Sequence, residues 1–259
     1  MGHIRLGRLP RTHRWEQVIG LLGAGAPVSD VAAASAKAAE TALDEASSDP
    51  ALVHTFWLLT QVPLAARSND YRGSLERLGI KAGSDPSLLA VVTAFQRAVD
   101  DHVRHVSGKT DLGEMAQLAA AESLSTFVAR DLPGLFDVTA GDVKLALGKL
   151  AAPDRFARLA RDFFSRLVWR SLEYFVSREI ANHIGPGRGL RSIQSQVDFR
   201  QALEQHCREA ALIVEAFAGG WYSKTNFNGG ITQRKAANFA HVAFKKLRAE
   251  LGKRAATDA

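Results

Sequence analysis

The sequence predicts an all-α protein, and three observations support that prediction. Apolar residues recur at helical spacing along the whole chain, and alternating runs of β-branched residues are absent. Proline, glycine and aspartate interrupt this pattern at short intervals, as they do between helices. The composition, 46% hydrophobic and 23% charged, is that of a globular protein. We therefore expect a compact domain of roughly nine or ten helices.

The first segment, residues 1–14, is expected to be a basic arm. It contains four arginines and no acidic residue, so its charge is +4. A short helix should follow over residues 15–22. After a turn rich in glycine, Ser29 or Asp30 can cap an alanine-rich helix that extends to about residue 46.

Two aspartates that precede prolines mark the starts of longer helices. Asp49 and Asp85 each supply an N-cap, and the proline after each fits the first helical position. The helix after Asp49 should stop or kink before Pro63, because proline removes a backbone donor and clashes with the preceding turn. The helix after Asp85 should extend to about Val106, and a short helix over residues 71–78 should lie between the two.

A turn at residues 131–138 is the most plausible internal boundary of the chain. It follows a helix that Asp111 and Glu114 can begin as a capping box. We therefore divide the chain into a helical half over residues 15–134 and a second helical half over residues 135–259.

The second half contains the longest expected helix. Thr139 and Asp142 predict a capping box for a short helix before it. Pro153 then begins the long helix, which should extend to about Ile184. The expected core stripe of this helix consists of Phe156, Ala160, Phe163, Leu167, Ser171 and Tyr174.

A further helix follows a glycine-rich loop. Ser195 and Asp198 can cap this helix, and Gly219 with Gly220 can end it. Its expected core stripe consists of Phe199, Leu203, His206, Ala210, Ile213 and Phe217. We interpret His206 on this stripe as a hydrogen-bonded core histidine.

The C-terminal stretch, residues 219–251, carries the clearest functional pattern. Its first part should be a loop with the aromatic and polar side chains Trp221, Tyr222, Lys224, Asn226 and Phe227. Thr232 can then cap the final helix, and Gly252 can end it. One side of this helix is apolar, and the opposite side is a basic stripe formed by Arg234, Asn238, His241, Lys245 and Arg248.

This combination predicts a nucleic-acid-binding surface, because cations contact phosphates and aromatic rings stack on bases. Residues 232–254 carry a net charge of +6, so positive charge is concentrated at the two ends of the chain. The lead prediction is a non-catalytic, DNA- or RNA-binding accessory subunit of a larger bacterial assembly. A solvated face of a terminal helix explains the same stripe, and the protein would then be a protein–protein interaction scaffold. Insertion into a membrane surface is disfavoured, since the apolar side is rich in alanine.

The end of the long helix provides an enzymatic alternative. Arg178 continues a core stripe, where a charge needs a carboxylate or an anionic substrate as its partner. Arg178 and His183 have an Arg-x4-His spacing that resembles the short motif of HEPN ribonucleases, and the same spacing recurs elsewhere in the chain. The resemblance implies metal-independent RNA cleavage by these two residues, in a toxin or antiviral-defence role. The loop that follows offers Arg188 and Arg191 as anion ligands.

Other functional classes find little support in the sequence. The single Cys207 excludes internal disulfides and multi-cysteine zinc sites, and it fits a reducing compartment such as the cytoplasm. His102 and His105 are three residues apart and could share a metal, but no HExxH or Cys/His pattern is present, so neither a metal nor a cofactor is expected. The most apolar run, residues 51–66, is too short to span a membrane.

Overall fold

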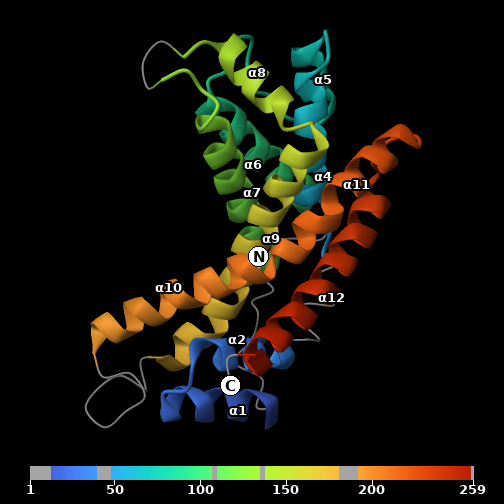
Figure 1. The fold of residues 1–259 in the computed structure, drawn as a ribbon. Coiled ribbons are helices and arrows are strands. Elements are labelled where there is room, and N and C mark those ends of the chain that lie inside the picture. The colour runs from blue at the N-terminus through green and yellow to red at the C-terminus, as the bar shows by residue number, and fades with distance from the viewer. Residues whose placement is uncertain (1–12, 40–47, 107–109, 135–137, 181–191, 258–259) are drawn as a thin grey trace.

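A computed structural model describes residues 13–39, 48–106, 110–134, 138–180 and 192–257, and every regular element over these residues is a helix (Figure 1). The all-α prediction is therefore confirmed. The helices are α1 (His13–Ala24), α2 (Val28–Ala38), α4 (Pro50–Ala66), α5 (Tyr71–Arg77), α6 (Leu88–Val106), α7 (Asp111–Ala129), α8 (Ala140–Lys149), α9 (Pro153–Ile180), α10 (Ile193–Ala210), α11 (Leu212–Phe227) and α12 (Gln233–Thr257). Only Ala211 separates α10 from α11, so counting the pair as one bent helix gives about the expected number.

The long helix α9 lies at the centre of the fold and packs against α7, α10 and α11 (Figure 1). Helices α5 and α8 lie at one end of the molecule, and α1 and α2 lie at the other. Helices α11 and α12 run side by side, and α12 also packs on α2 and α4. One hydrophobic core extends from Trp15 to Leu251 and includes residues of both expected halves. The division between residues 134 and 135 stays a prediction.

Several helix starts are those that the sequence predicts. The carboxylate of Asp49 accepts a hydrogen bond from the backbone N–H of Leu52 at 2.9 Å. Thr139 and Asp142 form the expected capping box at the start of α8. The hydroxyl of Thr232 accepts a hydrogen bond from the backbone N–H of Lys235 at 3.3 Å. Each cap satisfies a backbone donor that the helix itself leaves free.

Other helix starts lie a few residues away from the predicted ones. Helix α6 begins after Ser87 rather than at Asp85, α7 is capped by Thr110 rather than by Asp111, and α10 is capped by Ser192 rather than by Ser195. A serine or threonine hydroxyl close to the predicted start accepts the free N–H in each case, and such hydroxyls are effective N-caps. The expected basic arm is also shorter, since α1 begins at His13, and residues 1–12 lie outside the described residues.

Of the stop or kink expected before Pro63, the stop is wrong, because α4 continues through the proline to Ala66. Proline cannot donate to the carbonyl of Leu59, which weakens this turn. The hydroxyl of Tyr222 donates to the neighbouring carbonyl of Thr60 at 3.1 Å and so provides a tertiary bond in the same turn. Nearly all of α4 is buried, and this burial favours a continuous helix over a break.

The expected helix end at Gly219 and Gly220 is also wrong, because α11 continues to Phe227. A Cβ atom at Gly219 would lie 2.7 Å from the carbonyl oxygen of Pro153. The glycine therefore allows α11 to approach the start of α9 closely, and it does not end the helix. In the same way α12 continues past Gly252 to Thr257.

The predicted core stripes are mostly confirmed. On α9 the buried positions are Phe156, Ala160, Phe163, Leu167 and Ser171, whereas Tyr174 is half-buried. On α10 and α11 the stripe is buried at Phe199, Leu203 and Ala210 and half-buried at His206, Ile213 and Phe217.

Candidate nucleic-acid interface

The exposed face of α12 carries the predicted basic stripe. Arg234, Asn238, His241 and Lys245 are exposed, and Arg248 is half-buried. The opposite face is buried through Ala236, Phe239, Ala240, Ala243 and Leu247. The sequence pattern thus places the two faces correctly, and the packing of α12 fixes the direction in which its cations point.

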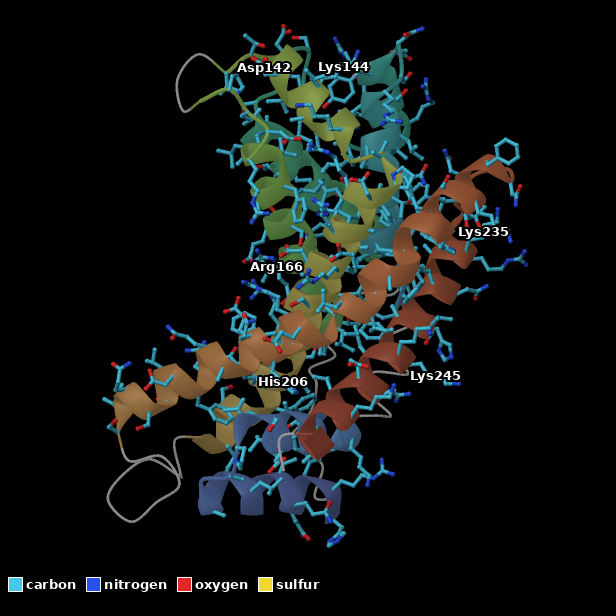
Figure 2. All side chains as sticks on the ribbon, viewed as in Figure 1. Asp142, Lys144, Arg166, His206, Lys235 and Lys245 are labelled. Atoms are coloured by element: carbon cyan, nitrogen blue, oxygen red, sulfur yellow. The ribbon has the colours of Figure 1, made fainter. Side chains whose placement is uncertain are left out.

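Two cations of this stripe have no carboxylate partner among the described residues. Within the described part of the chain, neither Arg234 nor Lys245 forms an ion pair, and the only acidic residue of α12, Glu250, lies near its C-terminal end. Lys245 projects from the outer edge of α12 in Figure 2. The adjacent Lys246 lies over the ring of Phe217 at 5.6 Å. Arg234 and Lys245 can therefore bind an external anion without first breaking a salt bridge.

The turn between α11 and α12 holds an aromatic ring in solvent. Gly229 and Gly230 adopt φ angles of 83° and 84°, which glycine adopts without strain. The Lys235 ammonium donates to the carbonyls of Asn228 and Gly230 at 3.1 and 2.8 Å and so closes the turn. Phe227, the last residue of α11, is 90% exposed. Its ring is available for stacking at the end of the basic face.

This turn is anchored to α4 by three hydrogen bonds. The Trp57 indole N–H and the Gln61 amide donate to the carbonyl of Ile231 at 2.8 and 3.3 Å. The Gln233 amide lies 3.0 Å from Nδ1 of His54, and the amide is the donor to a neutral ring. The start of α12 is therefore held in a fixed position relative to the core.

The aromatic loop predicted around Trp221 and Tyr222 is wrong, because both residues belong to α11. Tyr222 is 2% exposed and stacks on Phe156, with 3.8 Å between the ring centroids. Its burial raises the pKa of its hydroxyl well above the ordinary value. Trp221 is half-buried and contacts the ring of Phe239, with 4.3 Å between the centroids. Tyr222 is a core residue, and Trp221 leaves only part of its ring accessible.

The other two side chains of the expected loop remain on the surface. Lys224 and Asn226 are exposed on the last turn of α11, close to Phe227 in sequence. They are exposed helical residues of α11, not loop residues.

The structure describes little of the alternative enzymatic site. Arg178 lies in the last turn of α9, but its side chain is not among the described ones. His183, Arg188 and Arg191 lie outside the described residues. The ribonuclease hypothesis and the anion-binding loop therefore stay predictions.

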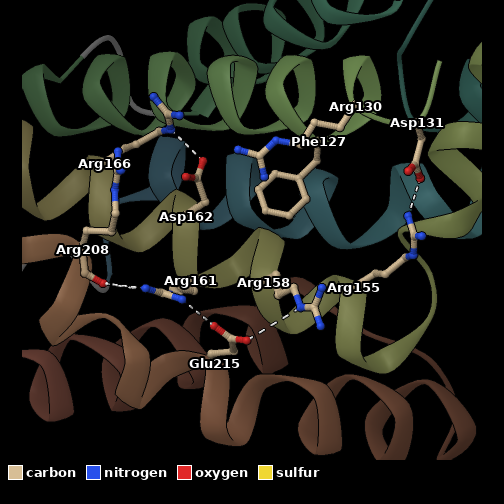
Figure 3. Close-up of a pocket in the computed structure, with 10 residues that line it drawn as sticks. All are labelled: Phe127, Arg130, Asp131, Arg155, Arg158, Arg161, Asp162, Arg166, Arg208 and Glu215. Atoms are coloured by element: carbon tan, nitrogen blue, oxygen red, sulfur yellow. Dashed lines mark hydrogen bonds and ion pairs between the residues drawn. The ribbon is translucent and has the colours of Figure 1, made fainter. Parts of the chain in front are cut away.

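The structure also brings together a group of arginines that the sequence pattern did not reveal as a site. Arg155, Arg158, Arg161 and Arg166 of α9 line a cleft of about 600 Å³ (Figure 3). In the sequence these arginines lie between the core positions of α9, and that pattern indicates a solvated helix face. The recurrence of arginine at short spacing was the only sequence signal for this site. It was insufficient because the other walls of the cleft come from segments distant in the sequence.

The remaining chemistry of the chain is limited over the described residues. No group of three or more side chains there is arranged to hold a metal ion. Cys207 is buried, and burial raises the pKa of its thiol to about 12, so the reactive thiolate is rare. Within the same residues, no helix combines the length and the apolar character needed to cross a bilayer.

Comparison of the chain with known protein families, with curated proteins and with solved structures finds no match.

Proposed function

We propose that this protein binds nucleic acid non-catalytically through the basic face of α12 and the turn that precedes it. The observation that carries the proposal is the arrangement of Arg234 and Lys245 on one exposed helix face, with Phe227 exposed at its end. Phosphate contacts supply most of the affinity of such surfaces. They require exposed cations that can contact the phosphates of the nucleic acid.

The aromatic contribution comes from Phe227 rather than from Tyr222. An exposed phenylalanine is unfavourable in water, and stacking on a base would bury its ring. Stacking does not depend strongly on base identity, so the surface fits sequence-tolerant binding of a single strand better than readout of a duplex groove. The fixed position of the turn on α4 reduces the entropy that ordering this surface would cost.

The test is fluorescence anisotropy of labelled single- and double-stranded oligonucleotides of DNA and RNA. Wild type is compared with Arg234→Glu/Lys245→Glu, in which both exposed cations are reversed. The matched control is Lys81→Glu/Arg97→Glu, which changes two exposed cations elsewhere on the surface by the same charge. We expect the α12 variant to weaken binding by roughly a hundredfold and the control to weaken it only slightly.

A wild-type protein that binds no oligonucleotide at physiological salt would contradict the proposal and favour the interaction scaffold. Equal losses in both variants would assign binding to net charge alone. Shortening of a labelled RNA during the incubation would favour the ribonuclease hypothesis, and His183→Ala would then test that hypothesis directly.

A further inference from the structure

The cleft beside α9 described above is lined mainly by guanidinium groups. Four of its arginines come from α9, and the others are Arg130 at the end of α7 and Arg208 of α10. Phe127 forms an apolar part of its wall, and the Arg130 guanidinium lies 5.3 Å from the centroid of that ring. The volume of about 600 Å³ lies within the usual range of small-molecule sites.

The three carboxylates of the cleft do not neutralise its six arginines. Asp131 pairs with Arg155, and Asp162 accepts from Arg166 at 2.6 Å. Each of these carboxylates therefore already has an arginine partner inside the cleft (Figure 3).

The third carboxylate, Glu215, holds the opposite wall together. Arg161 donates to it at 3.0 Å and also approaches the backbone carbonyl of Arg208 at 3.4 Å, so one guanidinium joins α9, α10 and α11. Arg158 reaches the other oxygen of Glu215 only at 3.9 Å, and its side chain is 62% exposed. Arg161 is therefore a structural partner of Glu215, and Arg158 remains available for a ligand.

Two arginines of the cleft lack a close carboxylate partner in the part of the chain that the structure describes. Over the described residues Arg130 forms no ion pair, and Arg158 forms only the long contact to Glu215. Arg208 uses its side chain on Glu204, outside the cleft lining, at 3.0 Å. Six arginines and three carboxylates line the cleft, and Glu122 and Glu204 outside the lining pair with Arg166 and Arg208. The excess positive charge therefore lies at Arg130 and Arg158, whose repulsion in the partly enclosed space is only partly screened.

We propose that this cleft binds an oligophosphate group, meaning two or more linked phosphoryl units. The planar guanidinium fork matches the oxygen geometry of a phosphoryl group and binds it through paired hydrogen bonds. Arg158 reaches the cleft from α9 and Arg130 reaches it from the end of α7, so the two available guanidinium groups come from different helices. A linked anion spans a longer distance than a single phosphate ion and carries more charge, so it gains more from arginines on separate helices. A free oligophosphate and a nucleotide both carry such a group, and the test below distinguishes them.

The test is isothermal titration calorimetry of the full-length protein with sodium tripolyphosphate, with ATP and with orthophosphate. We expect tripolyphosphate and ATP to bind far more tightly than orthophosphate, with one site per chain. ATP binding more tightly than tripolyphosphate would support a nucleotide that contacts Phe127. Equal affinities would support recognition of the oligophosphate group alone.

The decisive variant is Arg130→Gln/Arg158→Gln, because neither residue holds the fold through a short ion pair. We expect its tripolyphosphate affinity to fall roughly tenfold or more, and Arg158→Lys to lose less, since it keeps the charge. The matched control is Arg72→Gln/Arg104→Gln, which removes two exposed arginines on α5 and α6. It should bind as wild type does.

The site is separate from the proposed nucleic-acid face, so Arg234→Glu/Lys245→Glu should keep its tripolyphosphate affinity. No saturable binding by wild type would overturn the proposal. The same would follow if orthophosphate bound as tightly as tripolyphosphate, or if the control variant lost as much affinity as Arg130→Gln/Arg158→Gln.

Discussion

The hydroxyl of Thr110 donates to the carboxylate of Asp49 at 2.6 Å and so joins the N-caps of two helices. Asp49 caps α4 through its other oxygen, and Thr110 caps α7 by accepting from the backbone N–H of Gly113 at 2.9 Å. One chain of hydrogen bonds therefore satisfies donors at the starts of both helices. It fixes α7 on α4, and α4 in turn anchors the turn before α12.

We expect Asp49→Ala to lower the free energy of unfolding by about 2 kcal/mol, because it removes a cap and leaves Thr110 without its acceptor. Urea denaturation followed by circular dichroism measures this loss. Asp70→Ala is the control, since Asp70 caps the exposed helix α5 in the same manner. It should cost less than Asp49→Ala, and equal losses would show that the link between the caps contributes nothing.

Gly219 and Gly220 should respond to alanine in opposite directions. Gly219→Ala places a Cβ atom 2.7 Å from the Pro153 carbonyl, so we expect a loss of about 1–3 kcal/mol in stability. Gly220 is exposed and has nothing within 4 Å of the added Cβ, so Gly220→Ala should stabilise by about 0.5–1 kcal/mol. Urea denaturation of the two variants compares them directly. A stabilising Gly219→Ala would contradict the close approach of α11 to α9.

This pair of glycines shows where the sequence was insufficient to predict the structure. The caps Asp49, Thr139 and Thr232 were predictable because a cap depends on a few adjacent residues. A glycine that ends a helix and one that lets two helices meet look the same in sequence, and only the position of Pro153 distinguishes them. The error at Gly219 therefore produced an aromatic loop where the chain forms a helix.

The two faces of α12 were predictable for a similar local reason, because helical spacing determines which residues lie on each face. The cleft arginines were visible as residues, but their common site was not. Arg161 belongs to that site through Glu215, which is distant in the sequence and lies on α11. Pairings of this kind depend on tertiary packing, which a single sequence does not reveal.

Acidification should destabilise the protein through His54. Burial, followed by the charge of His102, lowers the pKa of His54 to about 4, and the two imidazole rings stack at 3.7 Å. The unfolded chain, with a His pKa of about 6.5, binds the proton more readily than the folded one. The stability is therefore full above about pH 6.5 and falls as the pH decreases toward 4.

The measurement is the melting temperature at several pH values between about 7.5 and 4.5. We expect the wild-type value to fall by roughly 5 °C more than that of His54→Gln, in which an amide can keep the contact with Gln233. His13→Gln, at an exposed position, is the control and should follow wild type. A pH dependence that His54→Gln leaves unchanged would exclude His54 as its source.

Substitutions at Phe227 and Tyr222 should affect oligonucleotide binding and protein stability separately. Phe227→Ala removes an exposed ring, so we expect unchanged stability and roughly tenfold weaker binding of a single-stranded oligonucleotide. Tyr222→Phe removes the hydrogen bond to Thr60, so it should cost about 1 kcal/mol in stability and leave binding intact. Denaturation and anisotropy on both variants test the pair. Weaker binding in Tyr222→Phe alone would contradict the corrected position of the aromatic surface.

The most direct test of the proposed function is the salt dependence of oligonucleotide binding. Each phosphate contact releases counterions, so the logarithm of the association constant should fall steeply and linearly with the logarithm of the salt concentration. We expect a slope that is shallower by about two for Arg234→Glu/Lys245→Glu, and the wild-type slope for Lys81→Glu/Arg97→Glu. A slope that the α12 variant leaves unchanged, or that both variants reduce equally, would contradict binding through the face of α12.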